Sequence, residues 1–427
     1  MTIVGIDDTD SRDGGMCTTY LAALLADRLR ERDAHVERLL LVRLNPAVEH
    51  KTRGNAALAL HTDSEPAIAF ELARELVDRH AVTADPNTNP GLVVAPHAPC
   101  DVPQELAAFA VRGVRDRHDR ADAHHAIETH GYRAEGWKNG RGLIGALAAV
   151  GAWRAFDDWT YEYITYRQPD RWGTRRDVDA ESVFAAAGKA YPAVWDTVDR
   201  STEDVVCTPH TPCPVLYGIR GDDPDAVRTV AEGIVSEPVE RSALFVTNQG
   251  TDAHLRDGTM ATVTDGESYR IGGVVDAPPE SRRGGHVFVP IRDGERRIEC
   301  VAFEPTKRFR DRVRSLRPRD RIIACGEVSD GTLKLEKFAV LDLVKTERVS
   351  PPCPSCERTM KSAGADQGYR CRDCGTHADE KLERSLERDL KVGWYEVPPA
   401  ARRHLAKPLV RGNFDAPKHP STDPPDE

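Results

Sequence analysis

The fold of the N-terminal part of this chain is decided by residues 2–30, TIVGIDDTDSRDGGMCTTYLAALLADRLR. A short apolar run ends in three aspartates, Asp7, Asp8 and Asp10, and a glycine pair then leads into apolar residues at helical spacing. Three like charges repel one another, so this turn is costly unless cations or hydrogen-bond donors lie among them. Strand, acidic turn, glycines and hydroxyl-rich helix start, in that order, are the layout expected of a site for a metal and a phosphate.

Three interpretations of the acidic turn stay open on its residues alone. In the first, the aspartates hold one or two magnesium ions that bridge nucleotide phosphates, and Thr18 or Thr19 lies close enough to contact or accept a phosphoryl group. In the second, residues 8–10 imitate the D-x-D nucleophile of aspartyl-phosphate phosphatases, although Ser11 stands where that motif has Thr or Val. In the third, the aspartates only cap a helix and solvate a turn.

Length and composition restrict the class of the protein. Its 427 residues suggest two to four domains. A window of about 18 uncharged apolar residues is absent, which excludes a membrane span. The first residues lack the pattern of a signal peptide, so we expect a cytoplasmic protein. The net charge of −10 argues at first sight against a nucleic-acid partner, but abundant Asp with little Lys also fits a salt-rich cytosol.

Hydrophobic periodicity divides the chain into segments. Strand-like and helical runs alternate up to about residue 120 and again after a charged stretch, and short strands with turns follow from about residue 260. One helical insertion among those short strands is the pattern of an OB barrel. The predicted domains are an α/β domain at residues 1–122, a ferredoxin-like α+β domain at 123–258, an OB-fold β-barrel at 259–347, a zinc ribbon at 350–380, and a C-terminal helix with a disordered acidic tail at 381–427.

Two cysteine pairs form the strongest local signal. The sequences CPSC and CRDC supply Cys353, Cys356, Cys371 and Cys374, which can close a tetrahedral thiolate shell around zinc. Four thiolates leave no open coordination position, so the zinc should be structural. The alternative is four unligated buried cysteines.

A basic stretch, KRFRDRVRSLRPRDR at residues 307–321, stands out in an acidic chain because it holds eight basic and two acidic residues. Apolar residues at helical spacing, Phe309, Val313 and Leu316, should anchor it to the barrel and leave its cations facing outward. Such a face can bind RNA phosphates, or it can be a solvated surface paired with neighbouring acids. The candidate nucleic-acid contacts are Lys307, Arg308, Arg310 and Arg314.

Two further stretches suit anions. Residues 45–60 place cations and a glycine just before a strand, and residues 136–151 place cations and glycines at a helix start. We expect these stretches and the glycine pair of the acidic turn to bind nucleotide phosphates. The candidate residues are Gly14, Gly15, Lys51, Arg53, Asn55, Lys138 and Arg141.

Several blocks of sequence, in order along the chain, resemble those of one enzyme family. They are GIDDTDS at residues 5–11, GGMCTTY at 14–20, KTRGNAA at 51–57, GRGLIGALAAVG at 140–151, TNQGTDAHL at 247–255, FEPTKRFR at 303–310, and the two cysteine pairs. On these blocks the chain resembles the archaeal tRNA-isoleucine agmatinylcytidine synthetases. The resemblance covers essentially the whole chain apart from the acidic tail.

The resemblance implies a kinase-like, ATP-binding N-terminal domain followed by ferredoxin-like, OB-fold and zinc-ribbon domains. It also implies an ATP-dependent carbon–nitrogen ligase that joins agmatine to the wobble cytidine of an isoleucine tRNA with a CAU anticodon. The product is 2-agmatinylcytidine, and the tRNA then decodes AUA. Thr18 matches the threonine that becomes phosphorylated in this family, and Asp7, Asp8 and Asp10 would hold Mg²⁺ and position ATP.

The partner of agmatine is less defined. Its guanidinium needs a carboxylate or carbonyl, and our candidate is Asp252, with His254 and His210 on neighbouring loops. A rival interpretation is a non-catalytic RNA-binding accessory built on the barrel and ribbon, but it leaves the N-terminal half without a purpose. A small-molecule kinase or phosphatase leaves the C-terminal half unexplained. The oligomeric state stays open.

Overall fold

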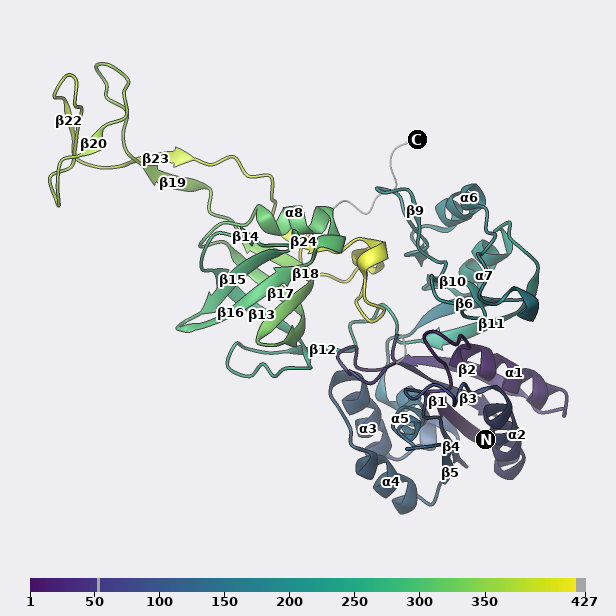
Figure 1. The fold of residues 1–427 in the computed structure, drawn as a ribbon. Coiled ribbons are helices and arrows are strands. Elements are labelled where there is room, and N and C mark those ends of the chain that lie inside the picture. The colour runs from purple at the N-terminus through teal and green to yellow at the C-terminus, as the bar shows by residue number, and fades with distance from the viewer. Residues whose placement is uncertain (52–53, 420–427) are drawn as a thin grey trace.

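The computed structural model describes residues 1–51 and 54–419 (Figure 1). Two expectations lie outside these ranges, namely the phosphate-binding role of Arg53 and the disorder of residues 420–427. Within the described ranges, no helix is both long and apolar enough to cross a membrane.

One nine-stranded sheet runs through the N-terminal half, with strand order β5-β4-β1-β3-β2-β11-β6-β10-β7. Its first part is a β-α-β-β-α-β unit, the N-terminal unit, whose four strands lie in the order 4-1-3-2 with antiparallel neighbours. The elements of this unit are β1 (Thr2–Asp7), α1 (Thr18–Arg30), β2 (Val36–Arg43), β3 (Ala56–Thr62), α2 (Pro66–His80) and β4 (Gly91–Ala95).

A second β-α-β-β-α-β unit, the second unit, repeats this strand order beside the first. Its elements are β6 (Thr160–Arg167), α6 (Ala180–Ala190), β7 (Val194–Trp195), β10 (Val215–Gly221), α7 (Pro224–Glu232) and β11 (Val239–Thr247). A short hairpin of β8 (Val198–Asp199) and β9 (Asp204–Val205) interrupts it. The two units join where β11 pairs in parallel with β2, Phe245 opposite Leu39 and Thr247 opposite Leu41.

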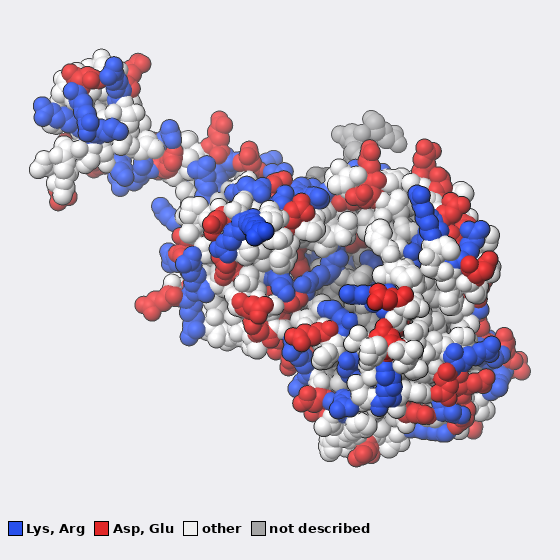
Figure 2. All heavy atoms as spheres, viewed as in Figure 1, with Lys and Arg blue, Asp and Glu red and all other residues white. Residues whose placement is uncertain are grey.

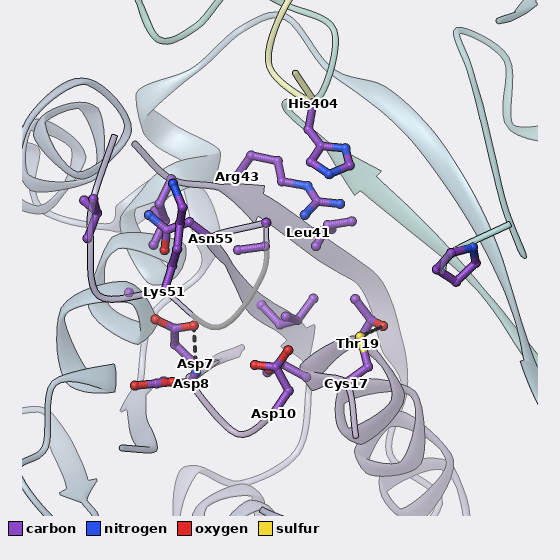
Figure 3. A pocket seen from close by; sticks show the side chains of 18 of the residues that line it. Asp7, Asp8, Asp10, Cys17, Thr19, Leu41, Arg43, Lys51, Asn55 and His404 are labelled. Atoms are coloured by element: carbon purple, nitrogen blue, oxygen red, sulfur yellow. Dashed lines mark hydrogen bonds between the residues drawn. The ribbon is translucent and has the colours of Figure 1, made fainter. Parts of the chain in front are cut away.

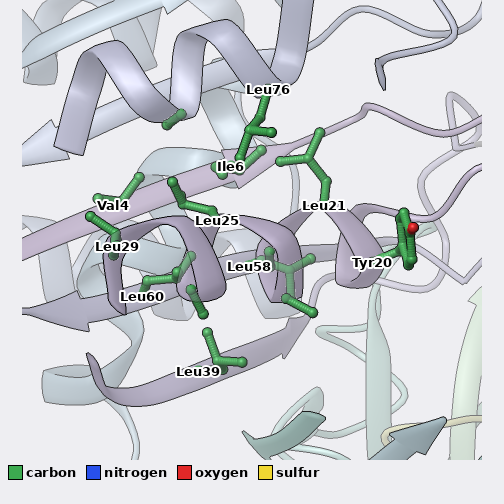
Figure 4. Close-up of a cluster of buried hydrophobic side chains, with 14 of the residues drawn as sticks. Val4, Ile6, Tyr20, Leu21, Leu25, Leu29, Leu39, Leu58, Leu60 and Leu76 are labelled. Atoms are coloured by element: carbon green, nitrogen blue, oxygen red, sulfur yellow. The ribbon is translucent and has the colours of Figure 1, made fainter. Parts of the chain in front are cut away.

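Alternating side chains of β1 pack into two hydrophobic cores, one on each face of the sheet. Val4 and Ile6 point toward α1 and α2, where leucines of both helices cover them (Figure 4), whereas Ile3 faces the opposite core. That opposite core is covered by α3 (Gln104–Arg115), α4 (Arg120–Thr129) and α5 (Gly142–Ala155). The short β5 (Arg133–Gly136) pairs with β4. Residues 133–155, which the predicted boundary at residue 122 assigns to the next domain, pack into the layers of the N-terminal unit.

Five strands form a closed barrel, in which each strand pairs with two others in the cycle β13-β15-β16-β18-β17. The elements here are β12 (Leu255–Asp257), β13 (Ser268–Val275), β14 (Glu280–Ser281), β15 (Val287–Asp293), β16 (Arg296–Ala302), α8 (Arg308–Arg314), β17 (Arg321–Ser329) and β18 (Thr332–Asp342). Phe309, Val313 and Leu316 are buried in the barrel core, as their spacing predicted.

The cysteine-bearing segment extends away from the barrel on a two-stranded ladder of β19 (Thr346–Val349) and β23 (Leu382–Ser385) (Figure 1). It contains three short strands, β20 (Lys361–Ser362), β21 (Tyr369–Arg370) and β22 (His377–Ala378). The four cysteines lie outside these strands, in the turns of the segment.

The predicted C-terminal helix is wrong. Residues 381–419 instead contain β24 (Gly393–Glu396), which pairs with β18, two short 3₁₀ turns, η4 (Pro399–Ala401) and η5 (Leu409–Arg411), and β25 (Lys418–His419). Prolines at 398, 399, 408 and 417 lack the N–H group that a helix needs. The described part of the predicted disordered tail is also ordered, because β25 pairs with β24 and Trp394 donates to Asp415 at 2.9 Å.

Candidate active site

A cavity of about 820 Å³ lies where the two units face each other. Its walls come from the end of β1, the start of α1, the end of β2, the loop before β3, the start of α5, and the loop at residues 204–213. Figure 3 shows its polarity: carboxylates gather at one end, and Arg43, Lys51 and His404 lie toward the other.

The acidic end is built by the turn after β1. The backbone N–H of Asp8 donates to Asp7 Oδ1 at 2.7 Å, and Asp8 Oδ2 accepts from the Arg141 guanidinium and the Asn89 N–H, each at 3.1 Å. Helix α5 lies so close that a side chain at Gly145 would overlap the Asp7 carboxylate. The small residues of α5 therefore make room for the aspartates.

Burial disfavours the charged form of Asp7 and Asp8. Burial raises the pKa of Asp7 well above its ordinary value, and neighbouring Asp8 and Asp10 add to the rise. Burial likewise raises the pKa of Asp8 to about 6, against the opposing effect of Arg141. Arg141 thus fails to offset the burial of Asp7 and Asp8, and a bound cation would lower the pKa of both carboxyl groups toward its ordinary value.

Thr18 begins α1 beside this cluster. Its hydroxyl accepts a hydrogen bond from the Thr9 hydroxyl at 3.0 Å, and its side chain lines the cavity. Neither Gly14 nor Gly15 lines the cavity, so the structure does not bring the glycine pair to the other candidates. Gly15 has φ +82, and a Cβ there would strike the Pro212 carbonyl oxygen, so it permits close packing of the turn against the second unit.

The basic end contains residues that the sequence analysis missed. Arg43, the last residue of β2, donates to Gln249 at 3.1 Å and lies 3.8 Å from Glu162. Arg220 donates to the same Glu162 at 3.2 Å. Although burial opposes it, Arg220 and Arg43 lower the pKa of Glu162. A charged residue inside the strand TYEYITYR was the available signal.

The structure brings most of the sequence-predicted catalytic and nucleotide candidates to one cavity. Those that line it are Asp7, Asp8, Asp10, Thr18, Lys51, Asn55 and Arg141, and the agmatine candidate His210 lines it too. Lys138 does not, because its ammonium is held by the carbonyls of Asp85 and Thr88, at 2.6 and 2.8 Å.

The agmatine candidates Asp252 and His254 also lie outside the cavity. Asp252 is ion-paired with the buried Lys337 at 2.6 Å, and His254 Nε2 lies 2.9 Å from Glu336 Oε2. Both pairs join the end of the second unit to strand β18 of the barrel. These side chains are held in a structural junction away from the cavity, so the structure does not bring them to the other candidates, and their role in agmatine binding stays a prediction.

Residues 398–411, here called the C-terminal strap, return from the barrel to the cavity. Arg411 donates to Asp222 at 2.6 Å and to Asp158 at 2.9 Å, and the Gly250 N–H donates to the His404 carbonyl at 2.7 Å. The strap thereby brings the His404 side chain to the cavity wall. No motif marked this segment in the sequence.

The barrel cations divide into two groups. Arg308 donates to the buried Asp199 at 3.1 Å and so fastens the barrel to the second unit, while its role as an RNA contact stays a prediction. Arg310 donates to the Gly285 carbonyl at 2.7 Å. Lys307 and Arg314 are more exposed and pair with Glu304 and Asp311 on their own segment.

The four cysteines of the zinc motif come together. Their sulfur atoms lie within 4.8 Å of one another, with Cys353 and Cys374 3.3 Å apart and Cys356 and Cys371 3.5 Å apart. Sulfurs at the corners of a tetrahedral zinc site are about 3.8 Å apart, given Zn–S bonds of about 2.3 Å. The cluster fits structural zinc, and among the described residues it is the one group with three or more metal-ligating atoms that close together.

Comparison with known proteins covers nearly the whole chain. Sequence models match the TiaS TCKD domain at residues 3–138, the TiaS FLD domain at 140–254 and the TiaS C-terminal zinc ribbon domain at 350–390. The isoleucine-tRNA 2-agmatinylcytidine synthetase TiaS of Haloquadratum walsbyi is 54% identical over 98% of this chain and 100% of its own. The protein of the same name from Methanosarcina acetivorans is 48% identical over 96% and 97%.

Two solved structures are similar over nearly all of both chains. A complex of TiaS with its isoleucine tRNA and ATP has a TM-score of 0.88 at 42% identity, covering 97% of this chain and 98% of that one. A complex of TiaS with the same tRNA, AMPCPP and agmatine has a TM-score of 0.84 at 40% identity with the same coverage.

Proposed function

The chain belongs to the TiaS family of isoleucine-tRNA 2-agmatinylcytidine synthetases, and from this premise we propose that it conjugates agmatine to the wobble cytidine of an isoleucine tRNA with a CAU anticodon. The reaction consumes ATP and makes the chain a carbon–nitrogen ligase of the cytoplasm. The non-catalytic RNA-binding alternative is not favoured, because relatives of full length are synthetases whose solved complexes contain ATP or its analogue and agmatine.

The oxygen at C2 of cytosine is a poor leaving group and must be activated before an amine can replace it. The carbonyl oxygen at C2 of cytosine attacks a phosphoryl group that comes from ATP, and the resulting C–O–P linkage makes that oxygen a good leaving group. The primary amine of agmatine then attacks C2, the C–O bond breaks, phosphate departs, and the amine loses a proton. The protein must therefore gather triphosphate, base and amine in one space.

The observation that carries the proposal is that a single cavity is lined by buried carboxylates, a helix-start hydroxyl and the cations of two facing units. Asp7, Asp8 and Asp10 would hold Mg²⁺, with nucleotide phosphates and water supplying the remaining ligands, and the ion would neutralise charge on the transferring phosphate. Thr18 would accept or contact the phosphoryl group, because its hydroxyl lies beside the acidic turn. Lys51, Asn55 and Arg141 would contact phosphates.

The remaining parts would carry RNA. The barrel has the strand order 1-2-3-5-4, with its helix between the third and fourth strands, and this supports an OB-type barrel. The order 4-1-3-2 supports a ferredoxin-like second unit. The N-terminal unit has the same topology as the second unit, so its topology does not support a kinase-like role. That part of the proposal rests on the cavity alone. The zinc ribbon and the barrel would bind the tRNA while the target cytidine flips out of the stacked bases of the anticodon loop.

The decisive experiment combines purified protein, ATP, Mg²⁺, agmatine and an unmodified isoleucine tRNA transcript. Mass spectrometry of the nucleosides should find 2-agmatinylcytidine only when all components are present. A transcript with uridine at the wobble position is the matched control and should stay unmodified. An intact wobble cytidine in the complete mixture would refute the proposal.

A further inference from the structure

Beside the main cavity lies a smaller alcove of about 240 Å³ with an unusual charge. Its described walls include Arg43, Lys51, Arg403 and His404 and contain no carboxylate. Three cations around so small a space are unexpected in a chain of net charge −10. Figure 2 shows Lys and Arg side chains gathered in the hollow between the barrel and the N-terminal half.

The carboxylates nearest to these cations are shared with other partners. Arg43 shares Glu162 with Arg220. Arg403 pairs with Glu327, which Lys334 also contacts at 3.1 Å. Positive charge therefore exceeds negative charge around the alcove. Burial, and next the nearby Arg403, lower the pKa of Lys51, as expected where cations crowd together.

His404 adds an unpartnered polar group to this wall. Its Nδ1 atom is buried and has no hydrogen-bond partner among the described residues. Burial lowers the pKa of His404 well below its ordinary value, and Arg43 and Arg220 lower it further, so the imidazole is neutral. A neutral imidazole carries one N–H that can donate to an anion without adding charge.

The position of the alcove, between the main cavity and the barrel, indicates which ligand it can bind. Arg43, Lys51, Gly54 and His404 line both the alcove and the main cavity, so the two spaces adjoin. Arg403 contacts Glu327 on β17 and lies 3.5 Å from Glu336 on β18, so the alcove also borders the barrel. An RNA strand held on the barrel, with one base in the cavity, must carry its backbone across this junction.

We propose that the alcove binds a backbone phosphate of the tRNA next to the target cytidine, held by Arg403 and His404 of the C-terminal strap together with Lys51 and Arg43. This inference rests on the proposed function. It adds a phosphate subsite that anchors the flipped nucleotide. An ATP phosphate is the other source of the same chemistry, and the experiment separates the two.

The test is a double-mutant cycle between protein and RNA. Transcripts assembled by ligation carry one uncharged methylphosphonate at each linkage of the anticodon loop in turn, and binding is measured for the wild type, His404→Asn and Arg403→Gln. One linkage next to the target should weaken wild-type binding about tenfold but have little effect on either variant. Lys334→Gln is the control, since Lys334 contacts Glu327 without lining the alcove, and it should respond as the wild type does.

The proposal would be overturned if, at every linkage and in both variants, the loss of binding caused by the methylphosphonate simply added to the loss caused by the substitution. So would an ATP affinity, measured without RNA, that falls in both variants while the RNA response stays wild-type, because the alcove would then serve the nucleotide. Thermal unfolding of each variant identifies any loss of folding, and the two substitutions are independent. Agmatinylation of the unmodified transcript by the wild type is measured first, so failure of the proposed function is seen separately.

Discussion

Arg402 of the C-terminal strap donates to Asp196 of the second unit at 2.8 Å, and the two side chains are only 5% and 6% exposed. Arg402 also contacts Glu396 on β24, the strand that pairs with the barrel. Burial raises the pKa of Asp196, while Arg402 acts in the opposite direction. One guanidinium therefore joins the second unit to a strand that pairs with the barrel.

Removal of this guanidinium should destabilise the protein. Arg402→Gln leaves two buried acids without their cation, and we expect the free energy of unfolding to fall by about 3 kcal/mol. Denaturant titration at fixed salt measures the change. Arg358→Gln, which breaks the exposed pair with Asp373, is the control and should change stability by less than about 0.5 kcal/mol. Equal effects of the two substitutions would contradict a structural role for the strap.

Asp8→Asn should abolish ATP turnover while tRNA binding survives, because the substitution removes a carboxylate from the proposed metal site and leaves the barrel untouched. Phosphate release and filter binding measure the two properties. Asp13→Asn alters an exposed acid of the same turn and should behave as the wild type. Wild-type turnover by Asp8→Asn would remove the metal-site interpretation.

Charge reversal on the barrel helix tests the RNA surface. Arg314→Glu should weaken tRNA binding by about tenfold or more at low salt and reduce the salt dependence of the affinity, with ATP turnover in the absence of RNA unchanged. The control is Arg28→Glu on α1, because Arg28 has a similar exposure and also pairs with an acid three residues away. Equal affinities for the two variants at matched salt would show that α8 is only a solvated face.

The junction between Glu336 and His254 predicts an acid-sensitive stability. Although burial opposes it, His254 and then Arg403 lower the pKa of Glu336 to about 2, from an ordinary value of 4.5. The unfolded chain binds this proton more tightly than the folded protein, so the stabilisation is complete above pH 4.5 and is lost as the pH falls toward 2.

Unfolding curves at a series of pH values measure this effect. Glu336→Gln should be less stable at neutral pH and should lose less further stability on acidification. Parallel pH profiles of the wild type and the variant would mean that Glu336 is not the group responsible.

Zinc removal should act locally. The four cysteines hold a segment whose strands are only two residues long, and the hydrophobic cluster there is small. A chelator should therefore unfold residues 350–385 first, seen as faster hydrogen exchange there while the barrel stays protected. Elemental analysis should find one zinc ion per chain. A protein without zinc would refute the assignment.

The sequence predicted features that are local in the chain. The acidic turn after β1, the cysteine pairs and the buried spacing of Phe309, Val313 and Leu316 each lie within one short segment. Contacts between distant segments were not predictable in this way. Arg43 on β2 and Glu162 on β6 meet only because both strands pair with β11, and His404 reaches the cavity from a proline-rich stretch without periodicity.

Two features were hidden from the sequence for the same physical reason. Asp252 and His254 looked like ligand-binding groups because charged residues on a loop are usually exposed, but the barrel packs over them and supplies Lys337 and Glu336. The repeated order of strands in the two units was equally hidden, since topology repeats here without a repeat in sequence.

The ladder between β2 and β11 joins the two units into one continuous sheet, so the units cannot move apart without breaking its backbone hydrogen bonds. The aspartates after β1 and Arg43 at the end of β2 belong to strands of this same sheet, so the separation of the acidic and basic walls is set before any substrate arrives. Distortion must then fall on the incoming loop of nucleic acid, which has to stretch and unstack to fit a gap of set width.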